Sequence, residues 1–397
     1  MVSLKATDED AAPMTIDIPV IDLTPFRAGT AAGKASVARA VAAAWETVGF
    51  LVVEGHGVDP AEGAALHASA LAFFDLPMQE KLAVRRPRND QNRGYIPYGE
   101  ETLARMHGGD TPPDYKEVFA IGPDDVPATP YYTGPLAYPD FAPNLWPAAP
   151  ITLRRHMLAY YASMVDLSRL LARIYAVALD LPEDFFAAKL TRHASQLRML
   201  HYPVPDRPFQ PGQLRCGAHS DLGMTTILRN EAAPGGLEVL TPAGDWVVAP
   251  ARPNTFIVNL GDLMMRWSND RWRSTQHRVA IPPAERRAES RRLSIGFFVV
   301  PEYDATVECV TGAAVTAKYP PITVREYRTD RFAAGAGAHG GGGGAEASTI
   351  ALSPSSNGGS GGSASGGAPG GDANGFGGAS DFGGAASGLG EVSSPSG

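Results

Sequence analysis

The stretch from Gln196 to Val300 places the strongest constraint on the fold, because short apolar runs alternate there with turn-forming residues. The turn signals include Pro211-Gly212 and Pro234-Gly235-Gly236. The apolar runs lie at 197–202, 224–228, 237–240, 246–248, 255–260, 277–281 and 293–300. Several short strands at this spacing predict an all-β barrel or a sandwich of two sheets.

The part of the chain before this β-rich region has a helical character. Two segments repeat apolar residues every three or four positions and predict amphipathic helices, at 31–49 and 151–180. Another helix is expected from Pro60 to about Phe74, because Asp59 can cap it and proline is tolerated in the first turn. Short strands are expected at 18–23 and 50–53. Residues 85–150 are rich in Pro, Gly and aromatic residues without a clear period, which favours long ordered loops over a site.

The end of the chain, from Ala334 to Gly397, consists mostly of Gly, Ala and Ser and holds more than half of the 44 glycines. Its large apolar residues are scattered, so it cannot bury enough surface to offset the entropy lost on ordering. We therefore expect a disordered tail over residues 333–397, and a flexible leader over residues 1–15. The part between them is long enough for one large β-rich domain.

Charge and cysteine content narrow the choice of partners and compartment. The net charge is −8 and no basic stripe is visible, so we expect no nucleic-acid partner. Cys216 and Cys309 cannot form a disulfide framework, which fits a reducing, cytoplasmic location. We expect no membrane association, because no apolar run approaches the roughly 20 residues of a membrane span. The N-terminal residues also lack the apolar segment of a secretory signal.

A candidate metal site begins with the segment Gly217-Ala-His-Ser-Asp-Leu222. In an extended segment His219 and Asp221 project to the same side. Taken alone, such a pair is more often a histidine near a capping aspartate than a ligand pair. His277 lies in a later predicted strand and could be the third ligand. Two neutral imidazoles and one carboxylate suit Fe(II) and leave open positions for a keto acid and O₂.

A candidate anion site lies in the last strand of the β-region. Arg292 and Ser294 share one face of that strand, whereas Arg291 points the other way and is expected at the surface. A guanidinium aimed into a β-core needs an anionic partner, and a carboxylate can bind it with two hydrogen bonds. The distal carboxylate of 2-oxoglutarate is such a partner. The alternative is that Arg292 is a surface residue beside Glu285 or Glu289.

Together, these motifs resemble the isopenicillin N synthase-like family of iron oxygenases, and its 2-oxoglutarate-dependent branch in particular. The resemblance covers about residues 16–332 and includes Gly55-His-Gly-Val58, Asp114-Tyr-Lys-Glu117 and Asn259-Leu-Gly-Asp262. It implies a mainly β fold with flanking helices, built on a double-stranded β-helix, or jelly-roll, core. It also divides the chain into an N-terminal dioxygenase segment over 16–150 and a second segment over 151–332, with the jelly-roll core starting at about 196.

The family's roles can be placed on matching residues. The resemblance implies that Tyr202 hydrogen-bonds 2-oxoglutarate, although it could also be an aromatic core residue. Phe298 stands where some relatives stack a substrate ring, and plain core packing is the alternative. Plant members often have Asn where this chain has Leu200, so the polar contact made there is absent or supplied differently. The implied cofactors are Fe(II), 2-oxoglutarate and O₂, with ascorbate as a candidate reductant.

The expected activity is hydroxylation or desaturation of a small molecule by a monomer, with release of succinate and CO₂. One alternative is an iron oxidase of the same fold that does not use 2-oxoglutarate, and another is a non-catalytic metal-binding protein. Residues 90–120 and the strand with Phe298 are expected to form the substrate pocket. The candidates in the first of these segments are Arg93, Tyr95, Tyr98, Lys116 and Phe119, which suit an aromatic or carboxylated molecule.

Overall fold

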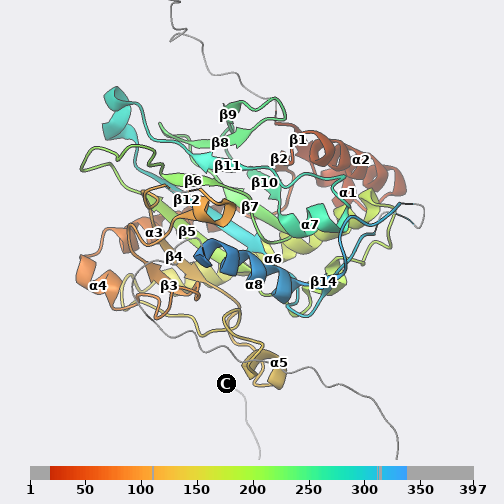
Figure 1. Ribbon diagram of the computed structural model, residues 1–397, viewed down its shortest axis with the longest axis horizontal. Coiled ribbons are helices and arrows are strands. Elements are labelled where there is room, and N and C mark those ends of the chain that lie inside the picture. Colours follow the sequence, from red (N-terminus) through yellow and green to blue (C-terminus); the bar gives the residue numbers. More distant parts are fainter. Residues whose placement is uncertain (1–17, 110, 311, 313–314, 338–397) are drawn as a thin grey trace, which may run out of the picture. The chain divides into compact units, whose positions relative to one another are not determined.

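The computed structural model describes residues 18–109, 111–310, 312 and 315–337. The predicted leader and the tail from residue 338 onward lie outside the described residues. Two sheets form the core of the described part (Figure 1). The larger has the strand order β1-β2-β10-β7-β12-β5-β4-β3, and the smaller has the order β6-β11-β8-β9.

The strands of the larger sheet are β1 (Val20–Asp22), β2 (Phe50–Glu54), β3 (Gly94–Ile96), β4 (Glu117–Ile121), β5 (Gln196–Tyr202), β7 (Thr225–Arg229), β10 (Phe256–Leu260) and β12 (Arg292–Val299). Those of the smaller sheet are β6 (Cys216–His219), β8 (Leu237–Leu240), β9 (Trp246–Val248) and β11 (His277–Val279). From β5 onward the chain passes back and forth between the two sheets, and this is the connectivity of a jelly roll. The predicted mainly β core is therefore confirmed.

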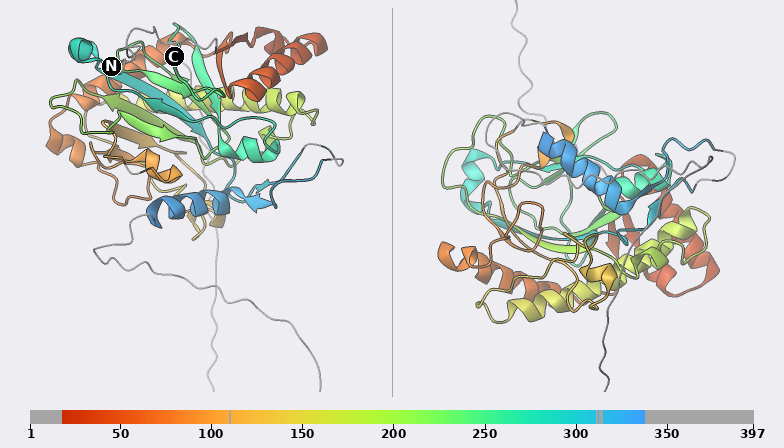
Figure 2. Two further views of the ribbon diagram at one scale, coloured as in Figure 1. Left: turned by 45° about the horizontal axis from the view of Figure 1, so that its top comes forward. Right: turned by 60° about the horizontal axis from the view of Figure 1, so that its bottom comes forward.

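Three helices pack on one another and cover one face of the larger sheet (Figure 2). They are α2 (Ala31–Thr47), α3 (Pro60–Phe74) and α6 (Leu153–Ala178), and each coincides with a predicted helix to within a few residues. The Asp59 side chain caps α3 by accepting from the backbone N–H of Ala61. None of the helices within the described residues is long and apolar enough to cross a membrane.

Shorter elements complete the structure. They are α1 (Thr24–Arg27), α4 (Met78–Leu82), α5 (Pro130–Thr133), α7 (Asp262–Trp267), α8 (Val324–Gly337), the 3₁₀ turns η1 (Leu103–His107), η2 (Ala187–Leu190) and η3 (Ala284–Glu289), and a small sheet of β13 (Thr306–Val307) and β14 (Ile322–Thr323).

The alternation of side chains on β12 decides which residues can reach a site between the sheets. Leu293, Ile295 and Phe297 are fully buried in the cluster that contains the apolar face of α6. Each contributes roughly 1.5–3 kcal/mol through removal of apolar surface from water. Since neighbouring strand residues point to opposite faces, Arg292 and Ser294 lie on the other face, toward the smaller sheet.

Two sequence-based expectations need correction. Residues 85–150 contain β3 and β4, which extend the larger sheet, and not only loops. All five residues of β4 are buried, so its sequence lacks the polar–apolar alternation that would have indicated a strand. In addition, α8 was not predicted, and it continues to Gly337, so the first residues of the segment expected to be disordered are helical.

Candidate metal centre and cosubstrate site

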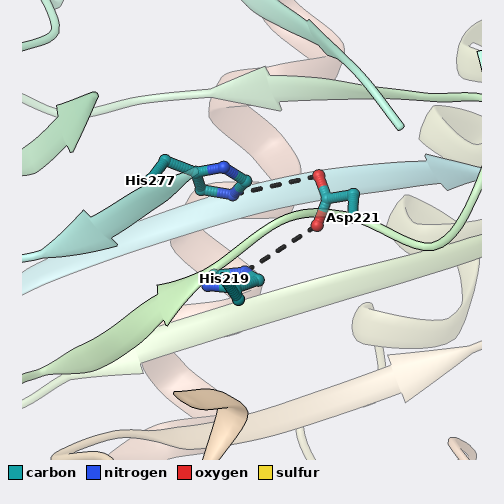
Figure 3. A group of neighbouring side chains, drawn as sticks. All are labelled: His219, Asp221 and His277. Atoms are coloured by element: carbon teal, nitrogen blue, oxygen red, sulfur yellow. Dashed lines mark ion pairs between the residues drawn. The ribbon is translucent and has the colours of Figure 1, made fainter. Parts of the chain in front are cut away.

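His219, Asp221 and His277 come together in the buried space between the two sheets (Figure 3). His219 ends β6 and pairs directly with His277, which starts the antiparallel strand β11. Asp221 follows β6 by two residues. Its two carboxylate oxygens lie 3.8 Å from Nε2 of His219 and 3.9 Å from Nε2 of His277. One donor atom from each residue therefore lies within 4.8 Å of the others, a spacing that could hold one metal ion.

Backbone carbonyls orient both imidazole rings. Nδ1 of His219 lies 2.8 Å from the carbonyl oxygen of Gly217, and Nδ1 of His277 lies 3.2 Å from that of Thr275. A carbonyl only accepts hydrogen bonds, so Nδ1 carries the proton in each ring and Nε2 keeps its lone pair. The ring of Phe50 also packs edge-on against His277, with ring centroids 5.5 Å apart. Both lone pairs are thereby directed at the common centre.

The larger sheet holds the Asp221 carboxylate. Its Oδ2 accepts hydrogen bonds from Oγ1 of Thr226 at 2.5 Å and from Nδ2 of Asn259 at 2.7 Å. Thr226 and Asn259 are paired residues of β7 and β10. Gly261 allows the close approach of the following turn, because a Cβ there would lie 2.2 Å from the carbonyl oxygen of Gly223. The Asn-Leu-Gly-Asp segment thus has a positioning role that its sequence alone does not reveal.

The electrostatics favour the protonation states that a metal requires. Burial, together with the neighbouring His277, lowers the pKa of His219 to about 3. Burial alone would raise the pKa of Asp221, but the two histidines and the hydrogen bonds from Thr226 and Asn259 outweigh it and lower that pKa. At neutral pH His219 is therefore a neutral imidazole and Asp221 a carboxylate.

Arg292 provides a buried, incompletely satisfied guanidinium in the same interior. It is 1% exposed, and its Nη2 donates to Oγ of Ser294 at 2.9 Å and to Oδ1 of Asn230. Tyr202 is its partner across the β5–β12 pair, with the ring centroid 5.0 Å from the guanidinium carbon. Nε and Nη1 of Arg292 have no hydrogen-bond partner among the described residues. A planar carboxylate fits this donor set. The alternative of a surface Arg292 is therefore wrong.

The sequence analysis did not single out two arginines and one asparagine that lie in the interior. Arg215 is fully buried beside Tyr202, and Asn230 contacts Arg292. Arg198 places its guanidinium 5.7 Å from the ring of Phe298. The sequence could have indicated the direction of Arg198 in β5, because Arg198 lies four residues before Tyr202 and therefore on the same face of the strand. Asn230 follows β7, where no local pattern indicates direction.

Two of the predicted substrate-pocket residues lie on the interior side. Phe298 shares the face of Arg292 and Ser294 and is partly exposed. Lys116 is buried, and its Nζ binds Asp114 and lies 3.3 Å from Oε2 of Glu101. Oδ1 of Asp114 in turn accepts from the backbone N–H of Gly217 at 2.9 Å, two residues before His219. Lys116 is thus neutralised by carboxylates and helps to position the strand that carries the first histidine.

Three other substrate-pocket predictions are wrong. Tyr95 and Phe119 lie on the face of the sheet covered by α3, where both rings pack against Phe73 with centroids 5.9 and 4.7 Å away. Arg93 is fully buried and donates to the backbone carbonyls of Asp140 and Ala142. The reason is the alternation of β3 and β4, two strands that the sequence did not indicate. Tyr98 is half-buried and packs against Tyr115, with ring centroids 4.5 Å apart.

Two protein families match this chain. Residues 18–149 match the family described as non-haem dioxygenase in morphine synthesis N-terminal. Residues 193–301 match the 2OG-Fe(II) oxygenase superfamily. The second match contains every residue of the candidate metal centre and of the Arg292 anion site.

Several known proteins are similar over most of their length. Validamycin A dioxygenase of Streptomyces hygroscopicus subsp. limoneus is 34% identical, over 79% of this chain and 85% of that protein. The 2-oxoglutarate-Fe(II) type oxidoreductase hxnY of Emericella nidulans is 33% identical, over 78% of this chain and 87% of that protein. The crystal structure of full-length Neurospora crassa T7H in complex with alpha-KG has a TM-score of 0.70 and 32% identity, over 80% of this chain and 96% of that chain.

These similarities agree with the buried His-Asp-His group, which fits iron, and with the free donors of Arg292, which fit a carboxylate. They confirm the predicted oxidoreductase class and its use of Fe(II), 2-oxoglutarate and O₂. They leave little support for an iron oxidase without 2-oxoglutarate or for a non-catalytic protein. The chain belongs to the 2OG-Fe(II) oxygenase superfamily and is a 2-oxoglutarate-dependent dioxygenase that oxygenates a small molecule.

Proposed function

We propose that His219, Asp221 and His277 are the iron ligands of this dioxygenase. The observation that carries this assignment is the convergence of one donor atom from each residue within 4.8 Å in a buried space. Two imidazoles and one carboxylate would hold an Fe(II) ion and leave coordination positions open for the cosubstrate and O₂. Iron and the keto acid supply the oxidising chemistry when bound, and the protein binds, orients and shields the reactants.

The proposed site for the distal carboxylate of 2-oxoglutarate consists of Arg292, Ser294 and Tyr202. Nε and Nη1 of Arg292 supply two donors that have no partner among the described residues. The Ser294 hydroxyl, 2.9 Å from Nη2, adds a third polar group. The two carboxylates of 2-oxoglutarate would thus be held by different parts of the core, one at iron and one at Arg292.

The substrate is proposed to contact Phe298 and Arg198 on the interior face of the larger sheet. Phe298 is partly exposed, whereas the other residues of β12 are buried. Arg198 lies against its ring, and Nη2 of Arg198 is paired with Glu101, whereas Nε of Arg198 has no hydrogen-bond partner among the described residues. An aromatic face beside a cationic donor suits a small molecule with a flat apolar part and an acceptor group. Hydroxylation is the proposed outcome, and desaturation is the alternative.

An anaerobic titration tests the cosubstrate assignment directly. The full-length Fe(II)-loaded protein is titrated with 2-oxoglutarate, and we expect a visible charge-transfer band that saturates. His219→Ala should abolish the band, whereas His156→Ala, on the distant helix α6, should keep it. Absence of a band in the wild-type protein would contradict the proposal. Screening metabolites for 2-oxoglutarate turnover, measured as succinate, then identifies the substrate.

Several expectations remain predictions. The protein is expected to be a monomer, to lie in the cytoplasm and to bind neither nucleic acid nor membranes. It is also expected to use ascorbate as a reductant. Size-exclusion chromatography with light scattering tests the first, and a nucleic-acid shift assay and a vesicle sedimentation assay test the binding predictions. Turnover numbers with and without ascorbate test the last.

A further inference from the structure

A second buried arginine, Arg215, lies against the same tyrosine ring as Arg292. Arg215 is 0% exposed and directly precedes β6 of the smaller sheet, whereas Arg292 starts β12 of the larger sheet. Their guanidinium carbons lie 6.0 Å and 5.0 Å from the centroid of the Tyr202 ring. Two positive charges from different sheets therefore meet at one tyrosine in the interior.

The partners of Arg215 are all neutral. Its Nη2 donates to the carbonyl oxygen of Pro203 at 3.1 Å and to Oγ of Ser290 at 2.9 Å, and its Nη1 donates to the carbonyl oxygen of Pro234 at 3.4 Å. Its Nε has no hydrogen-bond partner among the described residues. Burial, together with the charge of Arg292, lowers the pKa of Arg215 to about 10, so the side chain is still charged at neutral pH.

Within the described residues, neither guanidinium forms an ion pair with a carboxylate. Glu231, whose charge acts on Arg292, is itself paired with His67 and with Arg229. Elsewhere in the interior, Lys81 and Lys116 each have a carboxylate partner. Two buried cations on one tyrosine ring, without a facing anion among the described residues, repel each other and are stabilised when an anion enters.

We propose that Arg215 is a second cation of the cosubstrate site, which makes that site selective for a keto acid with a charged distal carboxylate. The inference rests on the proposed binding of 2-oxoglutarate at Arg292. In the absence of cosubstrate, Arg215 and Arg292 repel each other. A bound distal carboxylate compensates both charges. Arg215 is thus a specificity residue toward the cosubstrate, and its hydrogen bonds within the described residues go to Pro203, Pro234 and Ser290 and not to a proposed metal ligand.

Two keto acids that differ in the distal carboxylate distinguish recognition of that charge from a packing role of Arg215. The Fe(II)-loaded full-length protein is titrated anaerobically with 2-oxoglutarate and with 2-oxovalerate, which has the same carbon chain but no distal carboxylate. We expect Arg215→Gln to weaken 2-oxoglutarate binding by roughly tenfold or more, the loss typical of a hydrogen bond to a charged group. Binding of 2-oxovalerate should change little, so the ratio of the two dissociation constants, that of 2-oxovalerate divided by that of 2-oxoglutarate, falls. Arg215→Lys, which keeps the charge, should restore most of that ratio.

A second readout does not depend on ligand binding. If the two cations repel each other in the cosubstrate-free protein, Arg215→Gln should unfold at the same temperature as the wild type or at a higher one. A purely structural arginine, which fixes Pro203, Pro234 and Ser290, would give a lower unfolding temperature and an unchanged ratio of dissociation constants. That result would overturn the inference. Arg207→Gln, an exposed arginine in the preceding segment, is the matched control for both readouts.

The failure of this inference and the failure of the proposed function are distinguishable. If Arg292→Gln lowers the ratio of the two dissociation constants and Arg215→Gln leaves it unchanged, the inference about Arg215 is wrong. The proposed cosubstrate site at Arg292 then stands. If Arg292→Gln also leaves the ratio unchanged, the proposed site itself is wrong.

Discussion

Asn259 donates a hydrogen bond of 2.7 Å from its Nδ2 to Oδ2 of Asp221, and the donor and acceptor come from segments far apart in the sequence. This bond ties the carboxylate of the metal centre to strand β10 of the larger sheet. It fixes the direction in which the carboxylate faces the two histidines. The orientation of the Asp221 carboxylate therefore depends on Asn259, which is not itself a proposed metal ligand.

Asn259→Ala should weaken Fe(II) binding by roughly 10- to 100-fold, the usual effect of removing a hydrogen-bond partner of a metal ligand. The Asp221 carboxylate keeps its bond from Thr226 but loses the one that fixes its rotation. Anaerobic titration with Fe(II) measures the dissociation constant. Asn89→Ala, at an exposed position, serves as the control. Unchanged iron affinity in Asn259→Ala would rule out this positioning role.

Arg292→Ala should raise the dissociation constant for 2-oxoglutarate by roughly a hundredfold while Fe(II) binding is retained, because a buried charged partner of the carboxylate is lost. The adjacent residue provides a matched control. Arg291 points to the other side of the strand, where it pairs with Asp75 and contacts His201. Arg291→Ala should leave 2-oxoglutarate binding close to that of the wild type. Equal effects of the two substitutions would argue against the assigned strand face.

Phe298→Ala and Phe119→Ala should have opposite phenotypes. Phe119 is fully buried under α3, so its truncation should cost about 3–5 kcal/mol of unfolding free energy. Phe298 is partly exposed on the interior face, so its truncation should raise the substrate KM by up to about tenfold with a smaller loss of stability. Denaturant unfolding and steady-state kinetics distinguish the two. A normal KM for Phe298→Ala would place the substrate elsewhere.

Glu101 should contribute to the acid sensitivity of the fold. Burial alone would raise its pKa, but Arg198, Lys116 and Arg86 outweigh burial and lower it from the ordinary 4.5 to about 2. A depressed pKa in the folded state means that the carboxylate stabilises the protein above pH 4.5 and that this contribution is lost as the pH falls toward 2. Glu101→Gln should therefore flatten the dependence of unfolding free energy on pH in that window. A slope equal to that of the wild type would contradict this role.

The sequence located the candidate site well where neighbouring residues along one strand carry it. Arg292 and Ser294 share a face because side chains alternate along any strand, and this rule needs no knowledge of the strand's partners. The prediction that His219 and Asp221 face the same side also agrees with the structure, although Asp221 lies beyond the end of β6. The chemistry of two imidazoles and a carboxylate then pointed to iron.

Prediction failed where the face of a residue depends on distant strands. Tyr95 and Phe119 are aromatic residues in a segment that was expected to cover the site, yet β3 and β4 join the larger sheet and turn both rings toward α3. Lys116 is on the interior side, but Asp114 and Glu101 neutralise it. No local pattern distinguishes a lysine that meets a substrate from one that meets two carboxylates.

Local periodicity and residue chemistry thus determined the mainly β class, the helices α2, α3 and α6, and the list of candidate residues for binding iron and a carboxylate. Both signals act over a few residues, so they can be read along the chain. Tertiary structure alone decided that His277 pairs with His219, that Asn259 holds Asp221, and that Arg215 and Arg292 both lie against Tyr202. These contacts depend on the order and register of strands that are distant in the sequence, and register is set by the packing of the whole core.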